Sequence, residues 1–512
     1  MAEEATPNEE LPVKQQDNGD VVAAVGCCTS TKRFFLYDNH RRDVQAFYFN
    51  QFGRSILFIS FMFLSLGVLE FANKQAGCPQ NENGTYQNCD KKVYGMQASS
   101  ILSLMAIIGG LSTSVFMPYA GAVVDYSDHR LGFGRFCAAL LTLVNFVQIF
   151  IFENTWYAMV ILQSIIAAAT FMANSMVMWS YVSAPNDHDL HGITASGRVW
   201  ETFGMLSFFV VVGGVQIGTG WGSISLARFS QALATGVGGI NLFLAYTRYS
   251  PVKAVKVLEE GSNLYLAGLF ELKNTMTSLN KNEPAAARFL LGSVFVEASI
   301  SAFTNLAITY LSGQIEMTST SITIFIVVVL ACNPFGVIVH RSLSRKIGHK
   351  RSYVSCVGFT TIITALLIAC VYTPDDDKIA FIFAILFGIS FGWYYPCSNG
   401  FFVSLVPEEK VTELWGFNRY SMNYFKQALL SVIQQSSRFC SVILSWVPPM
   451  IFAALNESTG NLRIGLTGMI MFLSIGFVIA LTIPSNNASA RGNDPAGKDD
   501  VELAHADDQL AQ

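Results

Sequence analysis

Long apolar runs alternate with short polar segments along most of the chain. A helix needs about 20 consecutive apolar residues to cross the roughly 30 Å of hydrocarbon in a bilayer. About twelve runs reach that length, and they cover residues 52–72, 97–120, 134–152, 156–183, 197–217, 225–246, 287–311, 319–340, 352–372, 379–404, 428–455 and 462–483. This pattern predicts an all-α polytopic membrane protein with twelve transmembrane helices.

Three polar segments interrupt the pattern. Residues 1–45 and 485–512 lack apolar periodicity, so we expect disordered tails there. The first tail has no basic start followed by a short apolar stretch, which argues against a cleavable signal peptide. The longest polar stretch between spans, 249–286, is predicted to be a connector that separates two halves of six helices each, 46–248 and 287–484.

Composition agrees with a membrane protein. Hydrophobic residues make up 52% of the chain and charged residues 13%, whereas soluble domains carry about 25% charged residues. The net charge of −4 says little about partners, because most of the surface is expected to face lipid. We expect the bilayer and a small solute as partners, and no nucleic acid.

Several function classes lack their sequence signatures. The chain has no glycine-rich phosphate loop ending in Lys-Ser or Lys-Thr, which argues against an ATP-driven pump. It also has no HExxH, and its single GxSxG match, GISFG at 388–392, lies inside a predicted span, so neither motif supports a membrane hydrolase. Most of its ten cysteines lie singly inside predicted spans and suggest no metal site. We therefore predict a transporter rather than an enzyme, with no cofactor.

One polar loop indicates which side of the membrane it faces. The segment GCPQNENGTYQNCD places Cys78 and Cys89 around a glycosylation sequon at Asn83. A disulfide and a sugar would both place this loop in an oxidising lumen; the alternative is two free cysteines and an unused sequon. Loops then alternate, so both termini are predicted to be cytosolic. The densely basic loop HRSLSRKIGHKR would also be cytosolic, in agreement with the positive-inside rule.

A repeated segment supports two related halves. At the end of the second predicted span the chain reads MPYAGAVVDYSDHR. At the matching place in the second half it reads NPFGVIVHRSLSRKIGHKR, so that Pro118 and Pro334 align. This resembles the loop motif of the major facilitator superfamily, whose halves are related by such repeats. A plain turn with ordinary helix caps is the alternative to a gate. The predicted gating residues are Gly121, Asp125, Arg130, Arg135, Gly336, Arg341 and Arg345.

Shorter stretches resemble one branch of that superfamily, the autophagy-related protein twenty-two family of vacuolar amino-acid effluxers. The stretches are LGVLEFANKQAGC, ITASGRVWETFG, FLLGSVFVEASISAF, SLVPEEKVTELWGF and WVPPMIFAALNESTGNLRIG, in that order. The resemblance implies export of neutral amino acids from the vacuole or lysosome to the cytosol by alternating access.

Ionisable residues inside spans are functional candidates, because each costs about 2.5–3.5 kcal/mol to insert. Glu297 lies in the middle of the seventh span, and Ser301 and Thr304 follow it on the same helix face. An acid there suits a coupling proton or a substrate amine; a neutral, hydrogen-bonded glutamic acid is the alternative.

Arg198 and Glu201 are three residues apart at the start of the fifth span. They would either form a structural salt bridge, or leave Arg198 to bind a substrate carboxylate. The aromatic segment FGWYYPCSNG in the tenth span contains Pro396, which predicts a flexible or broken helix there.

Two other functions stay open beside amino-acid export. The chain could be a facilitator-type transporter of another small solute, or a transporter-like sensor that no longer moves solute.

Overall fold

The computed structural model describes residues 42–81, 86, 91–181, 187–251, 254, 263–282, 284–405 and 443–484. Helices dominate this part of the chain because a backbone in hydrocarbon must satisfy its own hydrogen bonds. The predicted tails at 1–45 and 485–512 lie outside the described residues, except that the first helix already begins at Arg42.

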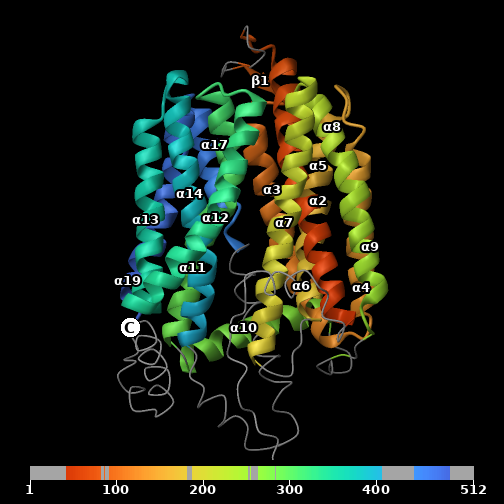
Figure 1. Cartoon of the computed structure of the whole chain (residues 1–512), viewed down its shortest axis with the longest axis vertical. Coiled ribbons are helices and arrows are strands. Elements are labelled where there is room, and N and C mark those ends of the chain that lie inside the picture. Colours follow the sequence, from red (N-terminus) through yellow and green to blue (C-terminus); the bar gives the residue numbers. More distant parts are fainter. Residues whose placement is uncertain are drawn as a thin grey trace, which may run out of the picture. The chain divides into compact units, whose positions relative to one another are not determined.

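The part of the chain before the connector forms helices along one common axis (Figure 1). They are α2 (Arg42–Ala76), α3 (Ser100–Tyr126), α4 (Arg130–Gln148), α5 (Trp156–Ile161) continuing through the π-helical turn η1 (Leu162–Ala167) into α6 (Ala168–Trp179), α7 (Asp187–Thr219), and α8 (Ser223–Leu233) continuing through the π-helical turn η2 (Ala234–Gly238) into α9 (Gly239–Arg248). A short antiparallel hairpin, β1 (Lys92–Val93) and β2 (Met96–Gln97), precedes α3.

The remaining elements follow the connector. They are α10 (Leu264–Asn282), α11 (Pro284–Gly313), α12 (Ser319–Ile347), α13 (His349–Cys370), the 3-10 turn η3 (Pro374–Asp376), α14 (Asp377–Leu405), α17 (Val447–Thr459), α18 (Leu462–Gly465) and α19 (Thr467–Thr482). We call the end of the bundle that carries α10 the α10 face, and the end that carries the hairpin the β1 face (Figure 1).

Within the described residues, ten helical segments are long and apolar enough to cross a membrane. They account for ten of the predicted spans. The predicted span 225–246 is the α8–η2–α9 segment, and part of the predicted span 428–455 lies outside the described residues. The prediction of a broken tenth helix is wrong: α14 runs through Pro396 without interruption.

Helix pairing repeats between the two parts of the chain. The second helix of each part packs on the fourth, as α3 does on α6 and α12 does on α14. The third helix packs on the fourth and the sixth in both parts, as α4 does on α6 and α9 and α13 does on α14 and α19. Small residues allow the closest of these approaches: a Cβ on Gly392 would lie only 1.9 Å from the carbonyl oxygen of Asn333.

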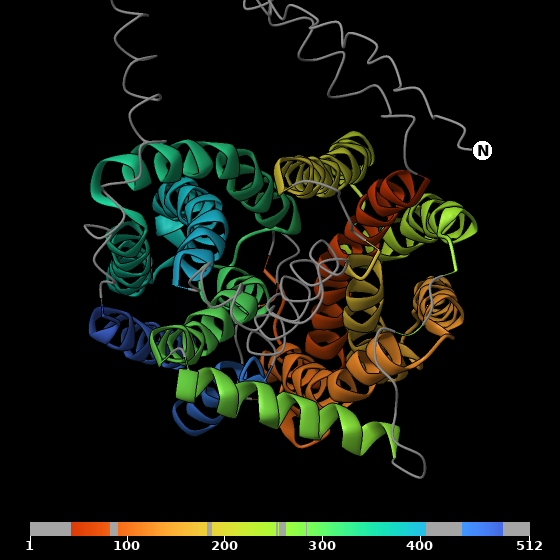
Figure 2. The same cartoon turned by 90° about the horizontal axis from the view of Figure 1, so that it is seen from below.

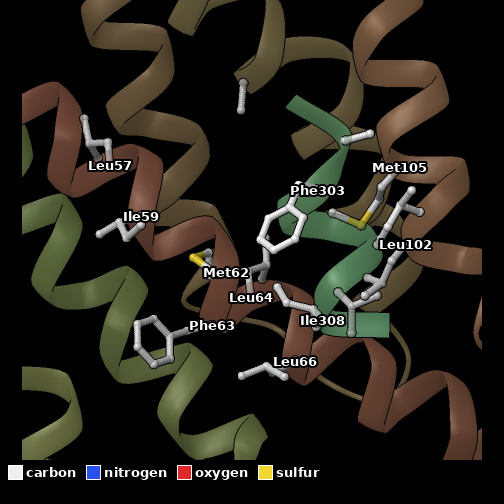
Figure 3. Close-up of a cluster of buried hydrophobic side chains, with 14 of the residues drawn as sticks. Leu57, Ile59, Met62, Phe63, Leu64, Leu66, Leu102, Met105, Phe303 and Ile308 are labelled. Atoms are coloured by element: carbon white, nitrogen blue, oxygen red, sulfur yellow. The ribbon is translucent and has the colours of Figure 1, made fainter. Parts of the chain in front are cut away.

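The apolar core is continuous across both parts near the β1 face. Phe303 and Ile308 of α11 belong to the same buried cluster as Leu102 and Met105 of α3 and Met62 of α2 (Figure 3). Toward the α10 face, the second part has a separate cluster around Phe289 and Tyr353. The core therefore joins the two parts most fully at the end that carries the hairpin.

The predicted polar connector contains the helix α10. This helix crosses the ends of the bundle helices instead of running beside them (Figures 1 and 2). It contacts α3 at Gly268, where a Cβ would lie 2.3 Å from the carbonyl oxygen of Pro118. Its C-terminal end leads into α11 after one residue.

Candidate functional site

A cluster of charged side chains lies between α2 and α7. Arg54 of α2 donates to one carboxylate oxygen of Glu201 at 2.8 Å, and Arg198 donates to the other oxygen at 2.8 Å. Arg54 also donates to Gln51 at 3.1 Å, and its guanidinium lies 4.7 Å from the ring centre of Phe171. One acid therefore binds two arginines, and the predicted pair of Arg198 and Glu201 does form.

The two arginines differ in their surroundings. The Arg54 side chain is 5% exposed, while that of Arg198 is 48% exposed. The Arg198 guanidinium lies 5.7 Å from the ring centre of Tyr395 on α14, and Glu297 of α11 is within electrostatic range of it. Since α11 and α14 belong to the second part of the chain, the exposed side of Arg198 faces the space between the two parts.

Glu297 is partly buried and lies near the hydroxyl groups of Tyr353 and Tyr394. The predicted companion Ser301 is exposed, and its hydroxyl donates to the backbone carbonyl oxygen of Glu297 at 2.8 Å. The side chain of Thr304 lies outside the described part of the structure. Glu297 is thus within electrostatic range of Arg198 as well as of the two tyrosines.

This arrangement has the groups that a small zwitterion requires. The Arg198 guanidinium can donate two parallel hydrogen bonds to a carboxylate. An ionised Glu297 can accept from an ammonium group, and a protonated one can carry a proton. The ring of Tyr395 adds an aromatic surface beside the cation.

Arg54 is a site residue that the sequence analysis did not identify. It lies close to the start of the first apolar run, where an arginine is ordinarily expected to extend to the membrane surface. The available signal was an arginine inside an apolar run, with Asn50 and Gln51 just before that run. Its partner Glu201 is 147 residues away, so no local pattern could pair them.

Uncharged polar residues in the third and fourth spans connect helices to one another. Asn145 accepts from Ser60 of α2 at 3.1 Å, and Gln148 donates to Gln163 at 2.9 Å. Asn174 donates to Asn50 at 2.9 Å and accepts from the Tyr246 hydroxyl. These buried contacts are of the kind that holds membrane helices together.

The predicted gating residues between α3 and α4 contact the first part of the chain, and Asp128 beside them accepts from the backbone N–H of Ala254 in the connector at 2.6 Å. Buried Arg130 donates to the carbonyl oxygen of Val124 at 2.9 Å, and Asp125 is within electrostatic range of it. Exposed Arg135 donates to the carbonyl oxygen of Tyr246 at 3.3 Å. Gly121 lies near Met176, to which a Cβ would be 3.5 Å away. The loop therefore fastens the end of α3 to α4 and α9.

The second copy of the motif is arranged differently. Gly336 is packed tightly within the second part, because a Cβ there would lie 2.1 Å from the carbonyl oxygen of Ile389 on α14. Arg341 and Arg345 are both exposed. His340 makes a 2.9 Å hydrogen bond with Ser344 of its own helix.

Polar contacts between the two parts gather at the β1 face. Asn456 of α17 donates to Gln97 and Ser99 at 2.9 Å each. Glu457 accepts from the backbone N–H of Gln97 at 2.6 Å and pairs with Lys92 of the hairpin at 3.3 Å. Three further pairs connect the parts there: Asn81 with Glu316, Ser223 with Ser319, and Gln216 with Thr323.

The structure describes only one of the two cysteines of the predicted disulfide. Cys78 forms a disulfide bond, whereas Cys89 and the sequon residue Asn83 lie outside the described residues. In the part of the chain that the structure describes, no three His, Cys, Asp or Glu side chains are placed to hold a metal ion.

Two described cavities lie away from the charge cluster. An apolar one of about 20 Å³ sits inside the second part, beside Phe303 and Tyr310. A polar hollow of about 580 Å³ lies at the β1 face, beside Glu316 and Asn461.

The sequence profile described as Major Facilitator Superfamily matches residues 47–431. No curated protein matches the chain. Among solved structures, a mutant of the nucleoside transporter NupG is 12% identical, with 86% of this chain and 99% of that one covered and a TM-score of 0.56. The xylose transporter XylE from E. coli, in a partially occluded inward open conformation, is 13% identical, with coverages of 86% and 100% and a TM-score of 0.56. An auto-inhibited peptide transporter of the POT family is 13% identical, with coverages of 88% and 97% and a TM-score of 0.55.

Proposed function

The chain belongs to the Major Facilitator Superfamily, and from that membership we propose that it is a secondary active transporter that exports neutral amino acids from the vacuole or lysosome to the cytosol. Membership establishes a transporter of small solutes in a multi-pass membrane protein. The amino-acid substrate, the direction and the compartment are the proposal. They extend the resemblance to the vacuolar effluxer family, which the profile does not test.

The placement of Arg198 opposite Glu297 is the observation that carries the substrate class. A guanidinium with half of its side chain exposed, and an acid on the facing part of the chain within electrostatic range, match the two charges of an amino acid. Glu201 pairs with both Arg54 and Arg198, but its single negative charge balances only one of the two positive charges. A substrate carboxylate would balance the remaining positive charge at Arg198. A neutral amino acid brings no further charge into the site.

The contacts between the two parts support the proposed direction. The described polar contacts and the joined core hold the β1 face together, so we propose that this state admits solute from the α10 face. The basic turn from Arg341 to Arg351 lies at the α10 face, which supports a cytosolic α10 face by the positive-inside rule. Breaking the β1-face contacts would then open the site to the lumen, and an acidic lumen would supply a proton to Glu297.

Counterflow in proteoliposomes tests this proposal. We expect exchange of radiolabelled Leu, Ile or Tyr, and we expect Glu297→Gln to reduce uptake driven by a proton gradient by at least about tenfold, which corresponds to about 1.4 kcal/mol. Glu153→Gln is the matched control, because Glu153 pairs with Lys74 on the exposed surface. Uptake unaffected by Glu297→Gln, or no exchange of any neutral amino acid, would contradict the proposal.

A second candidate is a facilitator of another small solute, since the similar structures are transporters of nucleosides, xylose and peptides. A panel of nucleosides, sugars and dipeptides in the same vesicles separates it from the first. The third candidate, a sensor that moves no solute, predicts no exchange with any member of the panel.

A further inference from the structure

The helix α10 occupies an unusual place for a connector. It lies across the ends of the bundle helices (Figure 1), at the rim of the bundle when viewed from the α10 face (Figure 2). At this rim the protein surface passes from the membrane to water. A helix that lies along such a boundary meets lipid head groups with whatever side it turns outward.

One side of α10 packs against the helix bundle. Gly268 sits against α3, and a Cβ there would lie 2.3 Å from the Pro118 carbonyl oxygen and 3.1 Å from the Ala122 side chain. This contact fixes the rotation of α10 about its own axis. The residues on the opposite side are consequently turned away from the bundle.

That outward side is apolar over its first two turns. Leu266, Leu269 and Phe270 are 49%, 37% and 58% exposed, and their i, i+3 and i+4 spacing places them on one face. Lys273 and Lys281 follow on the same side by helical position, and both are exposed. Large apolar residues beside exposed lysines are the composition of an interfacial membrane helix.

The neighbouring surface of α3 extends this face toward the hydrocarbon. Leu111, Val115 and Tyr119 are 41%, 62% and 36% exposed. They share one side of α3 with Pro118 and Ala122, the residues that touch α10. The apolar stripe of this membrane-spanning helix thus leads to the place where α10 crosses it.

We propose that α10 lies in the interfacial layer of the membrane, with Leu266, Leu269 and Phe270 among the acyl chains and with Lys273 and Lys281 bound to the head groups of anionic phospholipids. A polybasic segment next to a membrane gains affinity for anionic lipid with each lysine. Because α10 packs against the end of α3 and leads into α11, the bound lipid holds the connector against both parts of the transporter.

Thermal melting of the full-length protein in detergent tests the lysines. Added phosphatidylserine is expected to raise the Tm, and phosphatidylcholine is expected to raise it less. In the variant Lys273→Glu/Lys281→Glu, lipid affinity should fall by about fivefold or more for each lysine, and most of the phosphatidylserine-specific rise should be lost. The matched control is Lys346→Glu/Lys350→Glu, which makes the same charge change at the α10 face, at the end of α12 and the start of α13.

The outcome is decisive either way. A retained phosphatidylserine effect in the α10 variant overturns the proposal. An equal loss in both variants also overturns it, because the effect would then come from the net charge of the face. If the α10 variant does not fold, the single changes Lys273→Gln and Lys281→Gln give the same comparison.

A fluorescence experiment tests the apolar residues independently. Phe270→Trp adds one tryptophan to the seven of the native chain, and vesicles of dibrominated phosphatidylcholine quench tryptophans that lie among acyl chains. We expect the added signal to be quenched. Tyr94→Trp, on the exposed hairpin at the β1 face, is the comparison expected to escape quenching. An unquenched tryptophan at position 270 places α10 in water and overturns the proposal.

Discussion

Arg54 and Arg198 share the acid Glu201 but differ almost tenfold in exposure, at 5% and 48% of their side chains. A buried ion that loses its partner is costly, since the remaining charge stays away from water. When a half-exposed arginine is replaced by a smaller residue, water can fill the space that it leaves. We therefore expect Arg54 to hold the site together and Arg198 to contact the solute.

We expect Arg54→Ala to lower the free energy of unfolding by about 3 kcal/mol, and Arg198→Ala to leave it nearly unchanged while raising the KM for transport. Melting curves of the purified variants and the concentration dependence of uptake measure the two effects separately. Equal melting temperatures for the two variants would show that burial does not distinguish the arginines.

Asp376 provides a test at the β1 face, in the 3-10 turn η3 at the outer end of the segment Pro374–Phe402. The N–H groups of Tyr372 and Thr373 and the Thr373 hydroxyl all donate to its carboxylate, and these bonds hold the pKa of Asp376 below its usual value of 3.8. A lowered folded-state pKa means that the stabilisation is complete above the unfolded-state pKa and is lost as the pH falls through the folded-state pKa.

The loss of Tm caused by Asp376→Asn should accordingly be the same at about pH 7 and at about pH 5, and should shrink only below about pH 4. Melting curves of both proteins across this range measure it. The hydrogen bonds to Asp376 would thus persist at about pH 5. A difference that already disappears at about pH 5 would contradict the direction of the shift.

At the scale of elements, the two motif loops do not have equivalent surroundings. Asp125 lies within electrostatic range of buried Arg130, which holds the end of α3. His340 bonds only to a serine one turn further along its helix among the described contacts. A change at Asp125 therefore disturbs the junction of two helices, and a change at His340 disturbs one turn.

We predict that Asp125→Asn slows transport more than His340→Ala does. Initial uptake rates, normalised to the amount of reconstituted protein, provide the measurement. Equal rates in the two variants would count against a gating role for the first loop.

Sequence periodicity identifies the spans well because insertion into hydrocarbon depends on local composition. It underestimates their length: the run 319–340 belongs to a helix that extends to Ile347, since a helix continues past the membrane into polar residues. It also missed α10, whose apolar residues are too few to form a span. Pro396 was misjudged because neighbouring helices can support a helix around a proline.

At the scale of the whole molecule, the closed β1 face depends on residues far apart in the chain. Asn456 bonds to Gln97 across 359 positions, and no pattern within either segment predicts that meeting. The same is true of Arg198 and Glu297, which were both candidates but could not be placed opposite each other from sequence. Local sequence patterns predicted the helices and the candidate residues. The closed β1 face depends on how distant helices pack, which those patterns do not show.

A cross-link tests whether the β1-face contacts must break during transport. The hydroxyl groups of Ser223 and Ser319, from α8 and α12, lie 2.5 Å apart. We expect the variant Ser223→Cys/Ser319→Cys to lose uptake on mild oxidation and to recover it with a reductant. Each single variant is the control for oxidation of the native cysteines. A cross-linked protein that transports at the normal rate would show that the β1 face need not open.

The apolar cluster around Phe303, Met105 and Met62 carries a thermodynamic consequence (Figure 3). Opening the β1 face would expose part of this buried surface to water, and hydration of apolar surface raises the heat capacity. The balance between the two states of the transporter must then curve with temperature. Since apolar association weakens on cooling, cold should favour the state that is open at the β1 face, and the rate of solute turnover should depart from a straight Arrhenius line.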